Sequence, residues 1–275
     1  MTLVKLTCFA DEISSVLEEQ LDLLEHAGIS HLEIRNVWGK NVLDLSTEEL
    51  QQLHHITESR GFSVSSIASP IGKYPITSSN EPQLEALNRA IQAAQILKTP
   101  YIRIFSYFFP ENEPKENFRE EVLQRMAQLV EIAAQSEITL ILENDSGMYG
   151  STYEGGMEIM EHCQSPFIKF AFDPGNYVIE GIDPMKQAFP QVVSQIEYIH
   201  IKDAISSPRQ FVPAGAGDGG LEILLIEMQK RSYAGFLSVE PHLHHYLPNA
   251  SDPERVLTAI HALTAILEKN GIEWK

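Results

Sequence analysis

Short apolar segments recur along the whole chain, and amphipathic stretches separate them. Each segment is three to seven residues long and places aliphatic or aromatic residues at successive positions, which is typical of strands buried on both faces of a parallel sheet. The eight predicted strands are Leu3–Phe9, His31–Ile34, Ser63–Ile67, Tyr101–Phe105, Thr139–Leu142, Phe170–Phe172, Tyr198–Ile201 and Phe236–Val239.

A helix is predicted after each of these strands. Ser15 and Ser46 each stand three residues before a glutamate, which is the spacing of a capping box. Asp183 and Asp252 each precede a proline, which suits the first turn of a helix. The predicted helices begin near Ser15, Ser46, Asn80, Asn117, Tyr153, Asp183, Leu221 and Asp252.

Eight alternating strand–helix units predict an α/β fold, a single (β/α)8 TIM barrel. No segment rich in Pro, Gly or Ser divides the chain, so one domain over residues 1–275 is expected. The alternative is an open doubly wound sheet, whose first strand usually leads into a glycine-rich phosphate loop. Here the first strand leads into Cys8-Phe-Ala-Asp11-Glu12, which contains no glycine, so the sequence favours the barrel.

Strands five to eight each end at a potential metal ligand. The four residues are Glu143, Asp173, His200 and Glu240, with 27 to 40 residues between successive members. Because the carboxyl ends of barrel strands meet at one mouth and build the active site, we expect these side chains to converge. Three carboxylates and one imidazole suit one divalent cation, which can be Mn²⁺, Mg²⁺, Co²⁺ or Zn²⁺.

Such a site predicts an enzyme in which the metal polarises a substrate carbonyl and stabilises a cis-enediolate. Glu143 and Glu240 are expected to flank the substrate as catalytic residues. One can remove a proton from carbon while the other returns it to the opposite face, which is epimerisation. Return of the proton to the neighbouring carbon is aldose–ketose isomerisation instead.

Two other functions remain open at this point. The first is a metal-dependent dehydratase of a polyol ketone, in which His242 or Lys202 assists the loss of hydroxide. The second, from a different class, is a non-catalytic sugar-binding barrel. The two opposed glutamates favour an enzyme, because binding alone does not need two bases.

Further polar residues are predicted to contact a sugar or sugar phosphate. They are Arg103, Asn176, Lys202, Arg209 and His242. Arg103 can instead support the carboxylates, Asn176 can belong to a turn, and Lys202 can pair with Asp203. The glycine-rich loop Pro213–Gly220 can hold a phosphate through backbone N–H groups, but it lacks the Lys-Ser/Thr of a P-loop, so a flexible lid or a plain loop is favoured.

The overall charge and composition exclude several kinds of partner. A formal net charge of −18 disfavours nucleic acid and anionic membranes. No apolar run is long enough to span a bilayer and no secretory signal is apparent, which predicts a cytoplasmic protein. Cys8 and Cys163 stand far apart, so neither a disulfide framework nor a CxxC pair is expected. The sequence leaves a monomer and a homo-oligomer both open.

The chain resembles the xylose-isomerase-like TIM-barrel superfamily of sugar phosphate isomerases and epimerases. The residues that carry the resemblance are Glu143-Asn144, Asp173-Pro-Gly-Asn176, His200-Ile-Lys202-Asp203, the Gly215–Gly220 loop and Glu240-Pro-His242. The corresponding Glu, Asp, His and Glu of ketose 3-epimerases bind one divalent metal, and their two glutamates exchange protons with the substrate. The resemblance implies the same roles here.

The resemblance does not fix the reaction, because inosose dehydratases share a similar set of residues. Asn176 stands where ketose 3-epimerases usually have a histidine. The related endonuclease IV group needs further histidines for a trinuclear zinc site. Strands two and three here end in Glu33-Ile-Arg35 and Ser69-Pro70, without a histidine, so that branch is excluded.

Overall fold

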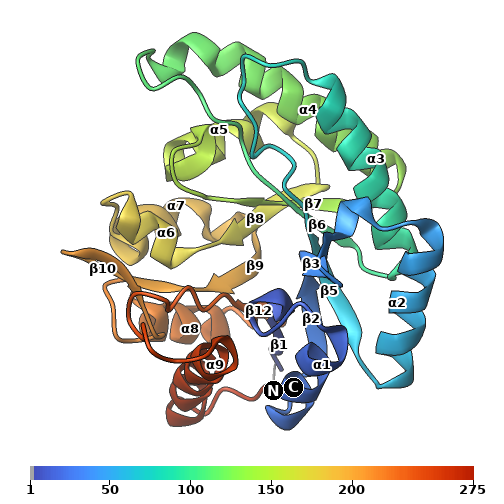
Figure 1. Cartoon of the computed structure of the whole chain (residues 1–275). Coiled ribbons are helices and arrows are strands. Elements are labelled where there is room, and N and C mark those ends of the chain that lie inside the picture. Colours follow the sequence, from blue (N-terminus) through green and yellow to red (C-terminus); the bar gives the residue numbers. More distant parts are fainter. Residues whose placement is uncertain (1–2) are drawn as a thin grey trace.

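Eight parallel strands form a nearly closed barrel with helices around its outside (Figure 1). The computed structural model describes residues 3–275, so the first two residues of the expected 1–275 domain lie outside the described residues. The barrel strands are β1 Lys5–Cys8, β2 His31–Ile34, β5 Ser63–Ala68, β6 Tyr101–Ile104, β7 Thr139–Glu143, β8 Ile168–Phe172, β9 Ile196–Ile201 and β12 Phe236–Val239.

The strand order around the barrel is β1-β12-β9-β8-β7-β6-β5-β2, and every neighbouring pair is parallel. A parallel bridge between Phe9 and Glu33 brings β1 against β2 and nearly completes the ring. The predicted TIM barrel is therefore confirmed, and the open sheet is excluded. All eight predicted strands are present, and each differs from its predicted bounds by at most two residues at either end.

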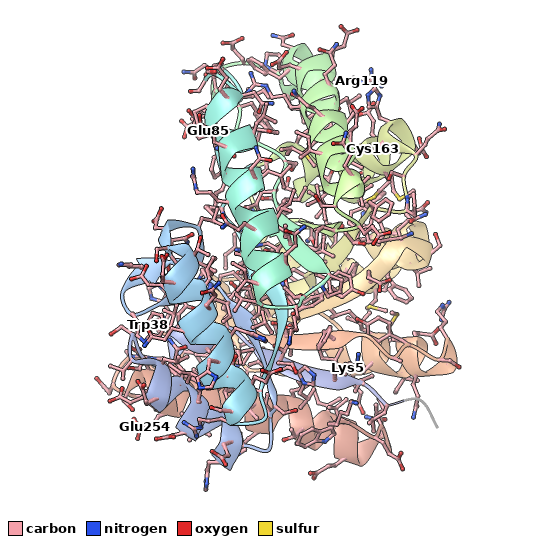
Figure 2. The ribbon with its side chains drawn as sticks, turned by 90° about the vertical axis from the view of Figure 1, so that its right-hand side faces the viewer. Lys5, Trp38, Glu85, Arg119, Cys163 and Glu254 are labelled. Carbon is pink, nitrogen blue, oxygen red and sulfur yellow. The ribbon has the colours of Figure 1, made fainter. Side chains whose placement is uncertain are left out.

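The helices cover the outside of the barrel with their apolar faces turned inward. In α1, for example, Leu17, Leu21 and Leu24 are fully buried. Figure 2 shows α2, α3 and α4 side by side on one flank. The α-helices are α1 Leu17–His26, α2 Thr47–Ser59, α3 Glu81–Ile96, α4 Arg119–Gln135, α5 Tyr153–Cys163, α6 Pro174–Ile179, α7 Phe189–Val192, α8 Leu221–Lys230 and α9 Asp252–Lys269. Within residues 3–275, none of the helices has both the length and the apolar character needed to cross a membrane.

Short helical turns complete the connections. They are η1 Ala10–Glu12, η2 Val42–Asp44, η3 Lys115–Phe118, η4 Tyr149–Ser151, η5 Pro184–Ala188 and η6 Val193–Gln195. The helix predicted near Asp183 is replaced by the π-helical turn η5, followed directly by α7. Asp183 still caps this turn, because its Oδ1 accepts hydrogen bonds from the N–H groups of Met185 and Lys186.

Only one of the two predicted capping boxes is present. At α2, the Ser46 hydroxyl accepts from Glu49 N, and the Glu49 carboxylate accepts from Ser46 N at 2.8 Å. The capping box predicted at Ser15 is wrong, because α1 begins one residue later with Val16 as its N-cap. Ser14 makes the local bond instead, its hydroxyl accepting from Val16 N at 3.1 Å.

Two hairpins that the sequence did not predict follow strands β2 and β9. The first pairs β3 Asn36–Val37 with β4 Lys40–Asn41, and the second pairs β10 Asp203–Ser206 with β11 Arg209–Val212. Each hairpin continues from the carboxyl end of its barrel strand, so both lie at the mouth where polar side chains gather. In Figure 1 the second hairpin extends outward from the barrel beyond β9.

Candidate metal centre

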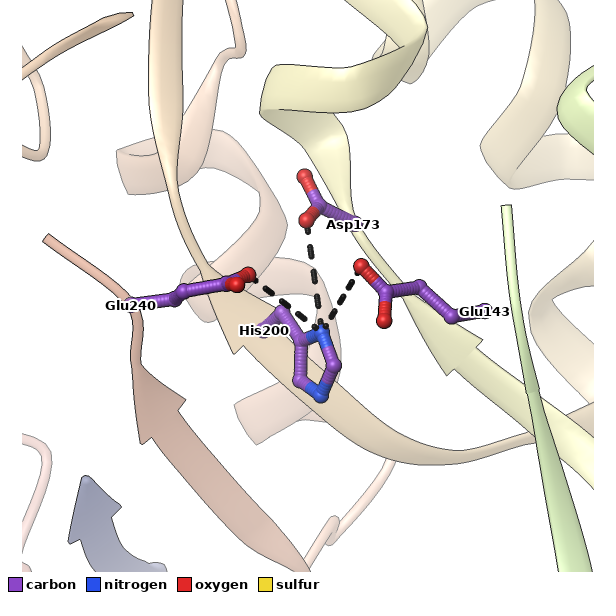
Figure 3. A group of neighbouring side chains, drawn as sticks. All are labelled: Glu143, Asp173, His200 and Glu240. Atoms are coloured by element: carbon purple, nitrogen blue, oxygen red, sulfur yellow. Dashed lines mark ion pairs between the residues drawn. The ribbon is translucent and has the colours of Figure 1, made fainter. Parts of the chain in front are cut away.

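The four predicted ligands come from four neighbouring strands of the barrel. Glu143 is the last residue of β7, Asp173 and Glu240 directly follow β8 and β12, and His200 lies near the end of β9. These strands are consecutive in the order β12-β9-β8-β7, so their carboxyl ends lie side by side. One ligand atom from each residue lies within 4.8 Å of the other three, and Figure 3 shows the three carboxylates facing one edge of the imidazole.

His200 presents its Nδ1 atom to the carboxylates. Nδ1 lies 3.4 Å from Glu143 Oε1, 3.9 Å from Glu240 Oε2 and 4.0 Å from Asp173 Oδ2. The ring is fully buried, and neither of its nitrogens makes a hydrogen bond with any of the described residues. Burying a polar atom without a hydrogen-bond partner destabilises a folded protein, and a bound divalent cation would serve as the missing partner. The donor set therefore fits a divalent metal.

Glu143 and Asp173 are held in place by neighbouring side chains. Arg103 donates to Glu143 Oε2 at 2.7 Å, and Asn176 Nδ2 donates to Glu143 Oε1 at 3.1 Å. Asn144 clamps the backbone of Asp173, because its side chain donates to the carbonyl and accepts from the N–H, both at 2.9 Å. Arg103 and Asn176 thus both hold Glu143, one at each carboxylate oxygen.

The two carboxylate oxygens of Asp173 have different partners. Its Oδ1 accepts from Asn176 N at 2.8 Å and caps α6, while its Oδ2 faces His200 and Lys202. Burial raises the pKa of Asp173 to about 6, although the nearby Lys202 ammonium opposes the rise. For Glu143 the balance is reversed, because His200 and Arg103 outweigh burial and lower its pKa.

Lys202 lies among the ligands rather than beside Asp203. Its Nζ is 2.8 Å from Asp173 Oδ2, 2.7 Å from Glu240 Oε2 and 3.8 Å from Glu143 Oε1. Burial alone would lower the pKa of Lys202, but Asp173 and Glu240 outweigh burial and raise it well above its usual value. Lys202 is therefore a charged neighbour of the cluster, and the expected alternative of a Lys202–Asp203 pair is wrong.

His242 contacts the other oxygen of Glu240. Its Nε2 lies 3.2 Å from Glu240 Oε1 and 3.3 Å from Glu12 Oε1. Despite burial, which favours the neutral ring, these carboxylates raise the pKa of His242 to about 9. Glu240 therefore turns Oε2 toward the cluster and Oε1 toward a protonated imidazole.

The Asp203 side chain binds the backbone of the glycine-rich loop Pro213–Gly220, which was considered for phosphate binding. Its carboxylate accepts hydrogen bonds from the N–H groups of Gly215, Gly217 and Gly219 at 2.8, 3.1 and 2.9 Å. A Cβ atom on Gly217 would lie 2.4 Å from Asp203 Oδ1, so glycine is required for this approach. Three of the N–H groups that could hold a phosphate are therefore bound internally, which favours the expected plain loop over phosphate binding.

Arg209 is the one predicted substrate contact that the structure does not bring to the cluster. It is exposed on β11, and among the described residues it does not border the cavity beside the ligands. That cavity has a volume of about 200 Å³. Arg103, Lys202 and His242 line it, whereas Asn176 lies behind Glu143.

Several cavity residues had no assigned role in the sequence. They are Asn36, Asn41, Lys73 and Asp145. Arg35 also lines the cavity, and its place just after the second strand, two residues beyond Glu33, is visible in the sequence. The two asparagines belong to the β3–β4 hairpin, whose two-residue strands leave too short a pattern to detect.

A family model described as the xylose isomerase-like TIM barrel matches residues 21–266 of the chain. The chain belongs to this family. A search of curated proteins gives no match. Among solved structures, the xylose isomerase-like barrel superposes on the IOLI protein with a bound zinc atom with a TM-score of 0.78, at 18% identity over 97% of this chain and 99% of that one.

Two further structures are similar to this xylose isomerase-like barrel over nearly its whole length. The probable 3-DHS dehydratase AsbF of Bacillus anthracis gives a TM-score of 0.76 at 17% identity, covering 95% of this chain and 98% of that one. An L-ribulose 3-epimerase gives 0.74 at 20% identity, covering 98% and 95%. At such identities the likeness establishes a shared fold, on which both epimerases and dehydratases are found.

Proposed function

We propose that the chain is a divalent-metal-dependent isomerase or epimerase of a small sugar, ketose or sugar phosphate. The observation that carries the proposal is the placement of Glu143 and Glu240 around Asp173 and His200 Nδ1, with one ligand atom of each residue within 4.8 Å of the rest. A divalent cation bound there supplies polarisation of a substrate carbonyl. The whole chain is proposed to act as one domain.

The two glutamates are proposed to move the protons. Each remains a carboxylate at neutral pH, because His200 and Arg103 lower the pKa of Glu143, and Lys202 and His242 lower that of Glu240, in both cases against burial. They project from β7 and from the end of β12, which are separated by two strands. A substrate between them therefore meets a base on each side, as proton removal and return require.

A dehydratase of a polyol ketone is the second candidate, and one observation favours it. His242 and Lys202 both carry protons next to Glu240, at 3.2 and 2.7 Å. In this reaction a glutamate removes the proton next to the carbonyl, and one of these cations protonates the departing hydroxide. Similarity to the probable 3-DHS dehydratase AsbF supports keeping this candidate.

A panel of ketoses, ketose phosphates and inososes, assayed with Mn²⁺, Mg²⁺, Co²⁺ and Zn²⁺ in deuterated water, tests the proposal. An epimerase or isomerase incorporates deuterium into a recovered sugar that has lost no water. A dehydratase releases a product that has lost one water. Binding of a sugar without exchange or turnover at any metal would instead identify a non-catalytic sugar-binding barrel.

A further inference from the structure

Glu33 places a fourth buried carboxylate beside His200, on the opposite edge of the ring. It lies on β2, its side chain is fully buried, and its Oε2 is 3.6 Å from His200 Nε2. The three carboxylates described above face Nδ1 instead. The imidazole is therefore enclosed between acidic groups on both of its nitrogen edges.

The contacts around Glu33 leave its charge largely unmatched. Ser238 donates to Glu33 Oε2 at 2.6 Å, while Oε1 makes no hydrogen bond with any of the described residues. Ser238 lies on β12 directly opposite His200 in the strand register. Burying a carboxylate with one neutral donor is expensive unless a cationic or strongly polarised N–H lies nearby. His200 Nε2, 3.6 Å from Glu33 Oε2, is a group that can meet this need.

The orientation of the His200 ring is fixed by packing. Phe9 and Tyr198 meet it edge-on, with ring centroids 5.3 and 5.8 Å away. A flip of the ring about its Cβ–Cγ bond would put Cδ2 in place of Nδ1 and Cε1 in place of Nε2, and the ring would have to move past both aromatic neighbours. Nε2 therefore stays toward Glu33, and Nδ1 stays toward the cluster.

We infer that Glu33 is a positioning residue for the metal centre. It accepts the Nε2–H of His200, which places the proton on that nitrogen and leaves the Nδ1 lone pair facing the cation. A carboxylate behind a ligating histidine fixes the tautomer and makes the imidazole a stronger donor. The 3.6 Å separation has only to close to ~3.0 Å for the bond to form. This role for the loaded site rests on the proposed function.

Glu33 is not an additional ligand. It faces Nε2, whereas the carboxylates that would hold a cation face Nδ1 on the other side of the same ring. A purely structural role predicts that a neutral group of the same shape would serve equally well, because glutamine can still bond Ser238. Glu33→Gln therefore separates positioning from packing.

The experiment compares wild type with Glu33→Gln by ¹⁵N NMR of the histidine side chains and by Zn²⁺ calorimetry. The His200 signal is assigned by its loss in His200→Gln. We expect a protonated Nε2 in the wild type, both metal-free and with Zn²⁺, and an upfield shift of that proton in Glu33→Gln. Zn²⁺ affinity should fall by ~10- to 100-fold with an unchanged unfolding midpoint of the metal-free protein.

Glu197→Gln is the matched control. Glu197 lies on β9 like His200, but near the other end of the strand, where it accepts a hydrogen bond from Tyr101. It should retain both the Nε2–H signal and Zn²⁺ affinity. A Glu33→Gln protein with wild-type affinity and signal would overturn the inference.

The wild-type spectrum decides the question even when Glu33→Gln does not fold. An unprotonated Nε2 there would also overturn the inference. Wild-type protein that binds no Zn²⁺ but keeps the Nε2–H signal would contradict the proposed metal centre and leave the Glu33–His200 pair standing.

Discussion

Lys202 has a large influence on the candidate metal centre. Its ammonium contacts Asp173 Oδ2 and Glu240 Oε2, the same two oxygens that face His200 Nδ1. Buried carboxylates need a nearby cation, and Lys202 supplies one from within the chain. A divalent cation at this site must share these oxygens with Lys202 or displace it, so the two cations oppose each other.

Lys202→Met should therefore strengthen metal binding. Removing the ammonium ends both the competition and the charge repulsion, and we expect Mn²⁺ affinity to rise by at least ~10-fold. The metal-free protein should lose roughly 3–5 kcal/mol of stability, because carboxylates are left unpaired. Calorimetry and denaturant unfolding measure the two effects. Lys73→Met is the control, because Lys73 pairs with Asp145 outside the ligand set. Weaker Mn²⁺ binding by Lys202→Met would contradict the competition.

Glu143 and Glu240 are the residues on which turnover should depend. Glutamine keeps the shape and one neutral oxygen but removes the base, so we expect Glu143→Gln and Glu240→Gln each to lose at least ~10²-fold in turnover. The measurement is turnover at saturating metal, together with deuterium uptake from solvent. Near-normal turnover in either variant would show that the two-glutamate mechanism is wrong. Loss of one exchange step alone would identify the face of the substrate that each glutamate serves.

His31 should make stability sensitive to mild acid, far from the metal centre. Burial, with Lys5 and Lys275 nearby, lowers the pKa of His31 to about 4. The unfolded chain binds this proton below its ordinary pKa of about 6.5. Stability from the neutral ring is therefore complete above pH ~6.5 and is lost as pH falls toward ~4. His31→Gln should lose less stability than wild type across that interval in urea titrations. His261→Gln, on the exposed side of α9, should follow the wild-type curve.

At the scale of elements, Asp203 joins the β10–β11 hairpin to the glycine-rich loop. It accepts from Ala204 N at 2.9 Å in addition to the three glycine N–H groups. The hairpin carries Phe211, whose ring meets His242 edge-on at 5.4 Å and lies 5.4 Å from Lys202 Nζ. One buried carboxylate thus supports the hairpin that places Phe211 against His242 and Lys202.

Asp203→Asn should loosen this whole segment. The amide presents N–H groups to two of the backbone donors, so at least two charge-assisted hydrogen bonds are lost and stability should fall by roughly 2–4 kcal/mol. Hydrogen exchange should rise across residues 203–220 and remain unchanged in the barrel strands. Asp218→Asn is the control, because Asp218 accepts its bonds from Ser206 at the exposed surface. Equal effects of the two variants would show that the buried carboxylate is not the support.

At the scale of the molecule, the candidate metal centre takes its four residues from four adjacent strands of a chain with a net charge of −18. A cation bound there contacts β7, β8, β9 and β12 in the folded protein alone, because unfolding separates the ligands. Its binding energy therefore adds to the stability of the barrel.

Metal should consequently raise the unfolding temperature, and chelator should reverse the rise. At a free Mn²⁺ concentration 100 times Kd, the added stability is about 2.7 kcal/mol. Asp173→Asn should abolish the effect, whereas Asp145→Asn should retain it because Asp145 lies outside the ligand set. Thermal denaturation with and without Mn²⁺ measures both. A full thermal shift in Asp173→Asn would contradict the single site.

The sequence by itself determined the barrel and the identity of the four clustered residues. Strands buried on both faces are continuously apolar, so their positions and number could be read from the chain. The carboxyl ends of parallel barrel strands meet at one mouth, so a residue at the end of a strand lies at that mouth. For this reason the sequence could group Glu143, Asp173, His200 and Glu240. Capping at Ser46 was likewise local and was predicted correctly.

Only the tertiary structure decided which polar groups meet. Glu33 and His200 lie on strands that are far apart in sequence but close together in the fold. Lys202 pairs with Asp173 and Glu240 and not with its sequence neighbour Asp203. Asp203 instead bonds the glycine loop, while Arg209 lies exposed on β11. Such pairings depend on rotamers, burial and backbone turns that bring distant segments within 3 Å or so. The periodicity of apolar residues predicts which face of a helix or strand is buried. It does not predict which residue a buried charged side chain will contact.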